Sequence, residues 1–156
     1  RITFIFIILL ISCSKSDNKK NNIEQVPIPT SKILFNNTPS TIKLDSTYLN
    51  TIDKWIPIIS FSQKFNDLID KEINHKSKIS SLAVDLNKIN KDNIPVEFKI
   101  SPIIGRLRVL KTFILKIDSY LLKNDNLEEY TADLRSLLES YNALIYQINL
   151  RAKEIS

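Results

Sequence analysis

The chain has 156 residues, of which 43% are hydrophobic and 25% charged, and its formal net charge is +5. This length and composition are typical of one globular domain with a sizeable apolar core. The single glycine excludes a glycine-rich phosphate loop and disfavours folds built from many tight hairpins. The modest positive charge is too small by itself to indicate nucleic-acid binding.

The sequence opens with Arg1, which is followed by an apolar run from residue 2 to residue 11. Ten helical residues span about 15 Å, which is half of a hydrocarbon core of about 30 Å. The run is therefore too short to cross a membrane and has the length of a signal-peptide core. Because the sequence contains no Met, we expect further residues to precede Arg1.

The apolar run ends in a motif that resembles the lipobox of bacterial lipoproteins: an aliphatic residue, a tolerated second position, a small residue and a cysteine. These four residues are Leu10, Ile11, Ser12 and Cys13. The resemblance covers the first 13 residues and implies that a signal peptide is removed before Cys13, which becomes attached to lipid. Several acyl chains on one cysteine make anchoring effectively permanent. Since Cys13 is the only cysteine, its modification would leave no disulfide, thiolate nucleophile or thiolate metal ligand.

The residues after Cys13 bear on which membrane holds the protein. Ser14 stands where some lipoproteins retained at the inner membrane have Asp, so the resemblance favours the outer membrane. Asp17 is the only acid in residues 14–18, which is a poor match to the acid-rich tracts that direct surface export in some bacteria. We therefore expect a lipid anchor on the periplasmic face rather than at the cell surface.

Three segments are predicted: a signal peptide (1–12), a lipidated cysteine with an extended tether (13–45) and a helical domain (46–156). The tether begins with polar residues that cannot bury enough surface to offset the entropy of ordering. Its prolines, Pro27, Pro29 and Pro39, then favour extended backbone. Apolar residues between positions 23 and 35 indicate that part of the tether lies against the domain.

A long first helix is predicted to begin with Asp45 or Ser46 as its N-cap. Its apolar residues recur at helical spacing: Tyr48, Ile52, Trp55, Ile59, Phe61, Phe65, Leu68, Ile79, Leu82, Leu86 and Ile89. Pro57 falls inside this pattern and must kink or split the helix. Glu72 and His75 occupy two seam positions, so the apolar stripe is expected to shift sideways around them.

A break and a second helix follow. Val96, Phe98 and Ile100 alternate with polar residues, which predicts an extended segment over residues 94–100. Ser101 and Pro102 are then the expected N-cap and first position of a helix. Its seam is formed by Ile103, Leu107, Leu110, Ile114, Ile117 and Leu121. Gly105 lies in its first turn, where either close approach of another backbone or neutral drift would explain it.

The last helix begins near Asp125 or Asn126 and has the clearest pattern in the chain. Its heptad positions are Leu127, Tyr130, Leu134, Leu137, Tyr141, Leu144, Ile148 and Ile155, with Arg151 as the one polar member. The short connection makes the last two helices antiparallel neighbours, and opposite charge balances, +4 for residues 94–124 and −3 for 125–156, agree with this. The predicted fold is all-α: a three-helix bundle with a long kinked first helix and an antiparallel coiled-coil-like hairpin of the last two.

No catalytic arrangement is found in the sequence. His75, with Glu72 one turn before it, is the only candidate for a metal ligand or general base, and a zinc site needs three or four ligands. No serine lies in a glycine-flanked nucleophile turn. We therefore expect no enzyme activity, no metal and no cofactor.

Two features are candidate interaction sites. Arg106, Arg108 and Lys111 could meet an acidic protein or an envelope polymer, and the alternative is a solvated face paired with the acidic last helix. Trp55, beside the predicted kink at Pro57, could line a groove, and the alternative is core packing. The leading hypothesis is a non-enzymatic, lipid-anchored interaction or scaffold module with a protein partner in the cell envelope and no nucleic acid. The alternative is a periplasmic or surface ligand-binding lipoprotein that uses the groove near Trp55 and Pro57.

Overall fold

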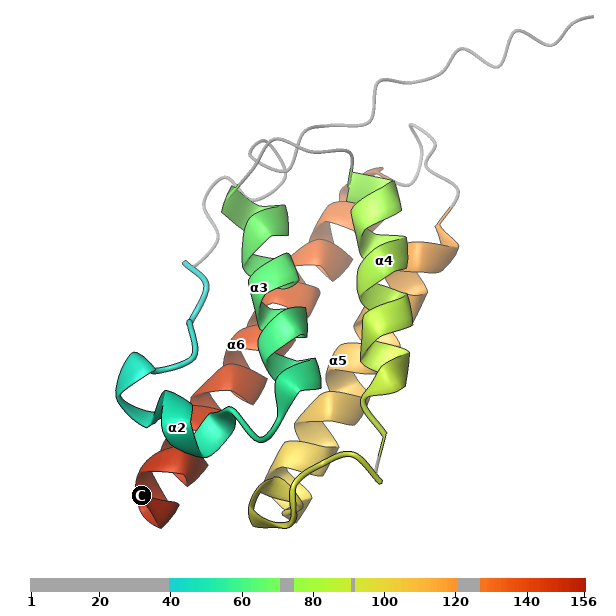
Figure 1. Cartoon of the computed structure of the whole chain (residues 1–156). Coiled ribbons are helices and arrows are strands. Elements are labelled where there is room, and N and C mark those ends of the chain that lie inside the picture. Colours follow the sequence, from blue (N-terminus) through green and yellow to red (C-terminus); the bar gives the residue numbers. More distant parts are fainter. Residues whose placement is uncertain (1–39, 71–74, 91, 121–126) are drawn as a thin grey trace, which may run out of the picture.

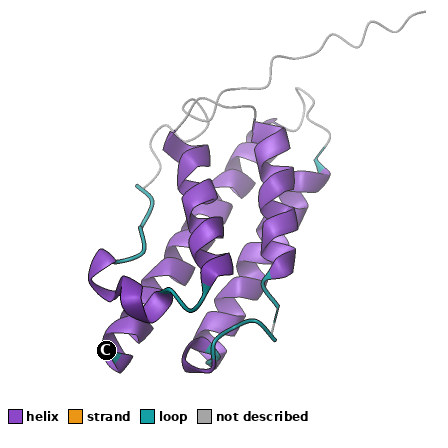
Figure 2. Cartoon of the chain, viewed as in Figure 1, coloured by secondary structure: helices purple, strands orange, loops and turns teal. Residues whose placement is uncertain are grey.

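The computed structural model describes residues 40–70, 75–90, 92–120 and 127–156 (Figure 1). The predicted signal peptide, the lipobox residues Leu10, Ile11, Ser12 and Cys13, and most of the tether lie outside the described residues. The described part is helical and contains no strand (Figure 2), which confirms the all-α prediction.

In the described part of the chain, four long helices lie side by side and run alternately up and down (Figure 1). They are α3 (Ile56–Asp70), α4 (His75–Lys88), α5 (Ser101–Ser119) and α6 (Leu127–Ile155). Each is packed against the next one in the chain, and α5 and α6 have the most extensive contact. Two short elements precede the bundle, a 3-10 turn η1 (Ser46–Tyr48) and α2 (Leu49–Ile52), and a second 3-10 turn η2 (Val96–Phe98) joins α4 to α5.

The start of the helical domain follows the predicted capping. The Asp45 side chain accepts a hydrogen bond from the Thr47 backbone N–H at 2.9 Å and so caps η1. The helix is split immediately before Pro57: α2 ends at Ile52 and α3 begins at Ile56. Proline is tolerated at the second position of α3 because its missing N–H would have no partner within the helix there.

The long first helix is not confirmed, because the chain forms two helices in its place. α3 ends at Asp70, α4 begins at His75, and the two lie beside each other in opposite directions (Figure 1). The bundle therefore has four long helices instead of three. The reversal falls where Glu72 and His75 interrupt the apolar seam; Glu72 lies outside the described residues. An amphipathic pattern records which side of a helix is buried but not whether the chain continues or turns back.

The extended segment predicted over residues 94–100 is wrong at its centre. Residues 96–98 form η2, and the Lys99 N–H donates to the Val96 carbonyl at 3.2 Å. Val96 is 80% exposed whereas Phe98 is 1% exposed, so the two do not share a buried face. Pro95, with extended backbone, starts this tight turn and allows Phe98 to enter the core.

Two details of α5 also differ from the prediction. Ile100, not Ser101, is its N-cap, and Ser101 is its first residue. A Cβ added at Gly105 would meet no atom within 4 Å, so close approach of another backbone does not explain this glycine.

Most of the predicted seam residues of α5 and α6 form the core; Leu121 lies outside the described residues, and Ile155 is only partly buried. On α5 the buried seam residues are Ile103, Leu107, Leu110, Ile114 and Ile117, and on α6 they are Tyr130, Leu134, Leu137, Tyr141, Leu144 and Ile148. A second buried stripe on α6, Leu138, Ile145 and Ala152, was not predicted. Besides α5, α6 contacts α2 and η1, and its Tyr141 stacks on Phe65 of α3, so α6 is covered on more than its α5 side.

Candidate functional site

A groove lies between the C-terminal half of α4 and the N-terminal half of α5. It encloses a cavity of about 190 Å³. Its apolar floor is formed by Leu86, Ile89, Ile94, Ile104 and Leu107. The cavity lies where α4 ends at Lys88, beside the first turns of α5.

The turn that follows α4 is held by its own asparagines. The Asn90 side chain accepts from the Asp92 backbone N–H at 2.9 Å, and the Asn93 side chain accepts from the Asn90 backbone N–H at 3.0 Å. The Asn93 side-chain amide also donates to the Lys88 carbonyl at the end of α4. These bonds satisfy backbone groups that the helix end leaves without partners, so this wall of the groove has a defined conformation.

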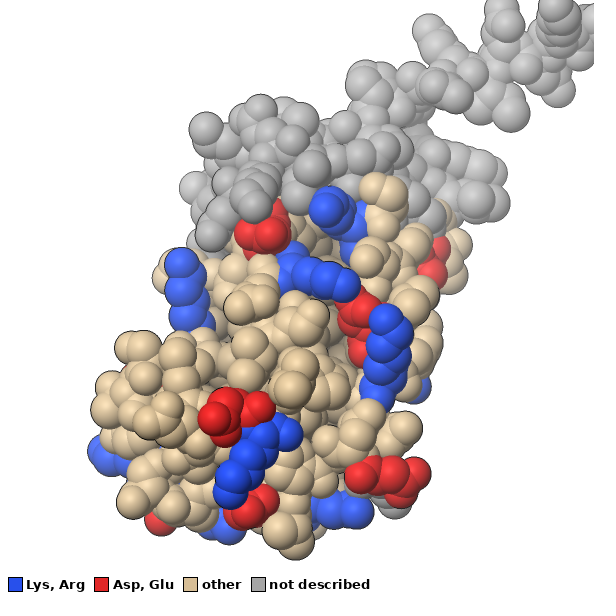
Figure 3. Space-filling model, in the orientation of Figure 1, with Lys and Arg blue, Asp and Glu red and all other residues tan. Residues whose placement is uncertain are grey.

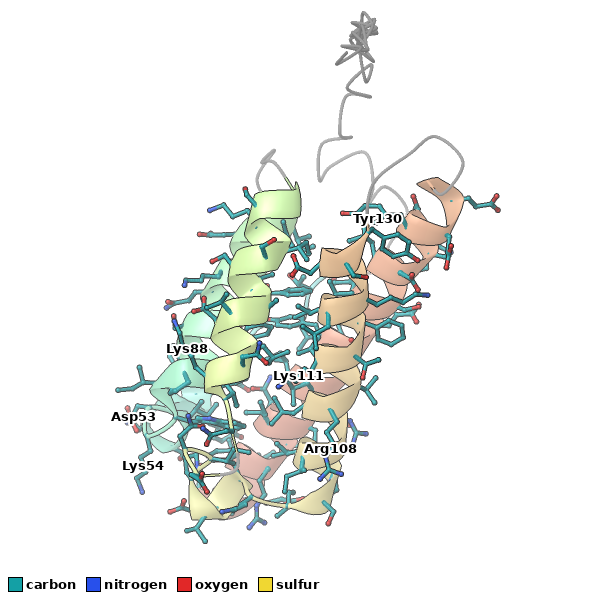
Figure 4. The ribbon with its side chains drawn as sticks, turned by 90° about the vertical axis from the view of Figure 1, so that its right-hand side faces the viewer. Asp53, Lys54, Lys88, Arg108, Lys111 and Tyr130 are labelled. Carbon is teal, nitrogen blue, oxygen red and sulfur yellow. The ribbon has the colours of Figure 1, made fainter. Side chains whose placement is uncertain are left out.

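The rim of the groove carries two cations and two amides. Arg108 and Lys111, one helical turn apart on α5 (labelled in Figure 4), line the groove from one side. Asn87 of α4 and Asn90, which follows α4, line it from the other. Within the described residues neither Arg108 nor Lys111 forms an ion pair. By contrast, Lys88 at the end of α4 is paired with Asp85 at 2.9 Å. The groove therefore combines an apolar floor with uncompensated positive charge at its mouth.

Arg106 does not belong to this groove. Residues two apart on a helix do not share a face, and Arg106 lies away from the residues that line the cavity. Its side chain donates to the Pro102 carbonyl at 3.3 Å, and its Nε is buried without a hydrogen-bond partner in the described part of the chain. The predicted basic run is thus divided: Arg108 and Lys111 act together and Arg106 stands apart.

Charge pairing between α5 and α6 is found at the other end of α5. Lys116 lies 2.8 Å from the buried Asp133 and 3.5 Å from Glu129, and the Tyr120 hydroxyl donates to the same Asp133 carboxylate. The hydrogen bond to Asp133 raises the pKa of Lys116, and burial together with Asp133 raises the pKa of Tyr120 to about 12. The complementary charges of the two helices therefore meet at Lys116 rather than at Arg108 and Lys111.

Trp55 is a core residue. It is fully buried, and its ring centroid lies 5.6 Å from that of Phe98 in η2. Its indole nitrogen has no hydrogen-bond partner among the described residues. The side chain is therefore not available on the surface beside Pro57, and it does not line the α4–α5 groove.

The described residues offer no evidence of a metal centre: no group of three or more His, Cys, Asp or Glu side chains is placed to hold an ion. None of the described helices is both long and apolar enough to span a membrane. On the face drawn in Figure 3, basic and acidic side chains are interspersed, so this face carries no patch of a single sign.

Comparisons with protein families, with curated proteins and with solved structures found no match to this chain.

The cations of the groove are predictable from the sequence, but the groove itself is not. Leu86, Ile89 and Leu107 were correctly expected to be apolar seam residues, but nothing in their spacing indicated that the contact would leave a cavity. The available signal was the cluster of asparagines at residues 87–93, which marks the end of α4 directly opposite the basic residues of α5.

Proposed function

We propose that the protein is a lipid-anchored, non-enzymatic interaction module of the bacterial cell envelope, and that its α4–α5 groove binds an acidic amphipathic helix of a partner protein. The lipobox-like motif ending at Cys13 supports the anchor and the outer-membrane location, with the periplasmic face preferred. The observation that carries the partner-binding role is the groove, in which an apolar floor lies beside two cations that have no acidic partner within the described residues.

The size of the cavity favours a protein partner over a small-molecule ligand. Small-molecule sites enclose roughly 300–1,000 Å³, whereas this cavity encloses about 190 Å³. That volume is suited to one or two large apolar side chains inserted from a partner surface, which is how the central residues of protein interfaces are buried. A ligand-binding lipoprotein that uses Trp55 has less support, because the indole is fully buried.

The charges of the rim favour an acidic partner. Arg108 and Lys111 flank the apolar floor on one side, as expected for a groove that receives a helix with one apolar and one acidic face. Such charges steer association and set the orientation of the partner more than they add affinity. A basic or neutral helix would leave both cations uncompensated.

In-cell photocrosslinking tests the groove directly. A photoreactive amino acid replaces Ile104, which lines the cavity and is half-buried. We expect a single adduct whose crosslinked peptide is acidic and amphipathic. The adduct should be lost in Arg108→Glu/Lys111→Glu but retained in Lys78→Glu/Lys153→Glu, which changes charge equally at exposed positions outside the groove. An adduct with lipid alone, or one that both double variants retain equally, would contradict the proposal.

Labelling with radioactive palmitate tests the anchor independently. We expect incorporation into the parent protein and none into Cys13→Ala. If the parent is not labelled, the anchoring proposal fails, while the groove experiment retains its meaning.

A further inference from the structure

The segment that precedes η1 is attached to α6 by two asparagines. Asn142 accepts from the Ile42 backbone N–H at 2.8 Å and donates to the Ser40 carbonyl at 3.1 Å. Asn149 accepts from the Asp45 backbone N–H at 3.0 Å and donates to the Lys43 carbonyl at 2.9 Å. The two amides thus make the same pair of contacts, each with the N–H of one residue and the carbonyl of the residue two positions earlier.

The spacing of the two asparagines matches that of the segment. They are seven residues apart on α6, a rise of about 10.5 Å. The residues they contact are three apart, and three residues of extended chain span about 10 Å. Asp45 has extended backbone, with φ −71° and ψ 119°. The distance between the two asparagines along α6 therefore matches the span of three residues of an extended polypeptide.

All four hydrogen bonds use backbone atoms of the segment. Its side chains contribute little: Ile42 is 37% exposed, Lys43 is exposed, and Leu44 is only partly buried against the core. Asparagine is also a weaker helix former than alanine, so two such residues in the middle of α6 do not serve the helix itself. Their structural role is the recognition of backbone.

We propose that the face of α6 around Asn142 and Asn149 is a binding site for extended polypeptide backbone, which residues 40–45 occupy and can leave while the four-helix bundle stays folded. We call residues 40–45 together with these two asparagines the backbone clasp. With the clasp closed, Ser40 is held beside Asn142; with it open, attachment to the bundle begins at η1. The clasp therefore decides where on the bundle the N-terminal part of the chain is attached, and this inference rests neither on the lipid anchor nor on the groove.

The energetics favour independent opening. The net stabilisation from one intramolecular hydrogen bond is similar to, or smaller than, the cost of ordering one backbone residue. The four bonds of the clasp and the partial burial of Leu44 against the core are set against the ordering of six residues. The closed and open states are consequently close in free energy. The buried core of the bundle does not include this segment.

Residue-resolved amide hydrogen exchange by NMR, on the full chain in detergent micelles, tests the clasp. The amides of Ile42 and Asp45 should exchange more slowly than expected for an unstructured chain, yet faster than the core amides of α5 and α6. In Asn142→Ala/Asn149→Ala both should exchange at least about tenfold faster, because each has lost its acceptor. Core amides should be unaffected, since alanine favours the helix. Gln63→Ala, which replaces an exposed amide side chain of α3, is the matched control and should leave both amides unchanged.

A second pair of variants separates backbone recognition from side-chain packing. Ile42→Pro removes the N–H that Asn142 accepts from and should accelerate exchange at Asp45 by about the same factor. Ile42→Ala keeps the N–H and should leave Asp45 protected. Equal effects of the two variants would overturn backbone recognition.

Two further outcomes would overturn the proposal. If Ile42 and Asp45 exchange only when the core amides of α5 and α6 also exchange, the clasp does not open independently. If their protection depends on protein concentration, the site is filled by the corresponding segment of a second copy rather than by the chain's own residues.

Discussion

Two contacts within the bundle are packed differently: the contact between α3 and α6, and the contact between the C-terminal half of α4 and the N-terminal half of α5. In the first, Tyr141 stacks on Phe65 with ring centroids 3.8 Å apart, and its hydroxyl bonds the buried Ser62 at 2.7 Å. In the second, aliphatic residues border a cavity of about 190 Å³, and Leu107 remains 9% exposed. Large aromatic rings fill the space between helices in one place, and smaller side chains leave it open in the other.

This difference indicates where the molecule tolerates change. A closed contact with aromatic stacking loses both apolar burial and packing when it is truncated. A contact that already contains a cavity, beside a loop, can relax and loses less. We therefore expect the α3–α6 contact to determine stability and the α4–α5 groove to be available for binding.

Truncation in the two contacts should give the largest effect and the sharpest contrast. Tyr141→Ala should lower the free energy of unfolding by about 3–5 kcal/mol. Leu107→Ala, in the groove, should lower it by about 2 kcal/mol, at the lower end of the range for leucine. Urea unfolding of both variants measures the difference, and equal losses would show that the groove is as tightly packed as the aromatic contact.

Removal of single hydroxyl groups tests the polar part of the closed contact. Tyr141→Phe leaves the Ser62 hydroxyl buried without its partner and should cost about 1–2 kcal/mol. Tyr130→Phe removes a buried hydroxyl that has no hydrogen-bond partner among the described residues, and should be neutral or slightly stabilising. Thermal unfolding distinguishes the two, and a comparable loss in Tyr130→Phe would reveal a partner for that hydroxyl.

Gly105→Ala should stabilise α5 beside the α4–α5 groove. The glycine lies in α5 between two residues of the groove, and an added Cβ meets nothing within 4 Å. Alanine is better in a helix interior by about 0.5–1 kcal/mol, so the variant should unfold at a higher temperature. A decrease would mean that the first turns of α5 need the freedom of glycine.

Stability at low pH tests the two ion pairs of Asp85, one with Lys64 of α3 and one with Lys88 in its own helix α4. Hydrogen bonds from Lys64 and then Lys88 lower the pKa of Asp85 below its ordinary 3.8. Because the folded-state pKa is the lower one, the stabilisation is complete above about pH 4 and is lost as the pH falls through the folded pKa. Asp85→Asn should be less stable than the parent by about 0.5 kcal/mol at neutral pH, and the difference should vanish near pH 2. Asp92→Asn, which removes the same charge at an exposed loop position, is the control variant.

Charge reversal at the groove should give the smallest change in stability. Arg108 and Lys111 form no ion pair within the described residues, so Arg108→Glu/Lys111→Glu should unfold within about 0.5 kcal/mol of the parent. The same variant is expected to abolish crosslinking at the groove. A large loss of stability would indicate that these cations serve the fold.

The two halves of the domain were not equally predictable. The buried seams were predicted correctly from Ile103 to Ile117 on α5 and from Tyr130 to Ile148 on α6, because their heptad patterns continue over many turns. In the first half, Pro57 correctly marked a split, but the reversal between α3 and α4 was interpreted as a sideways shift of one helix. Around Val96 and Phe98, a short alternating pattern suggested extended chain, whereas Pro95 and the burial of Phe98 produce a 3-10 turn.

The candidate sites were also only partly predictable from the sequence. Arg108 and Lys111 were identified from their charge, and tertiary packing placed them beside an apolar cavity and left Arg106 outside it. Trp55 was considered for a surface groove, but it lies in the core against Phe98. Asn142 and Asn149 were overlooked, although two asparagines one heptad apart inside a strong helix pattern were a usable signal.

The sequence by itself determined that the described domain is helical, most of the buried seam residues of its long helices, and that α5 and α6 pair. These properties follow from the spacing of apolar residues along the chain, which is a local quantity. Only the tertiary structure decided that four helices rather than three form the bundle, that a cavity opens between α4 and α5, and that residues 40–45 lie along α6. Each of these depends on how surfaces from distant segments fit together. The volume left between two helices, or the match in spacing between an extended segment and a helix face, cannot be derived from either segment alone.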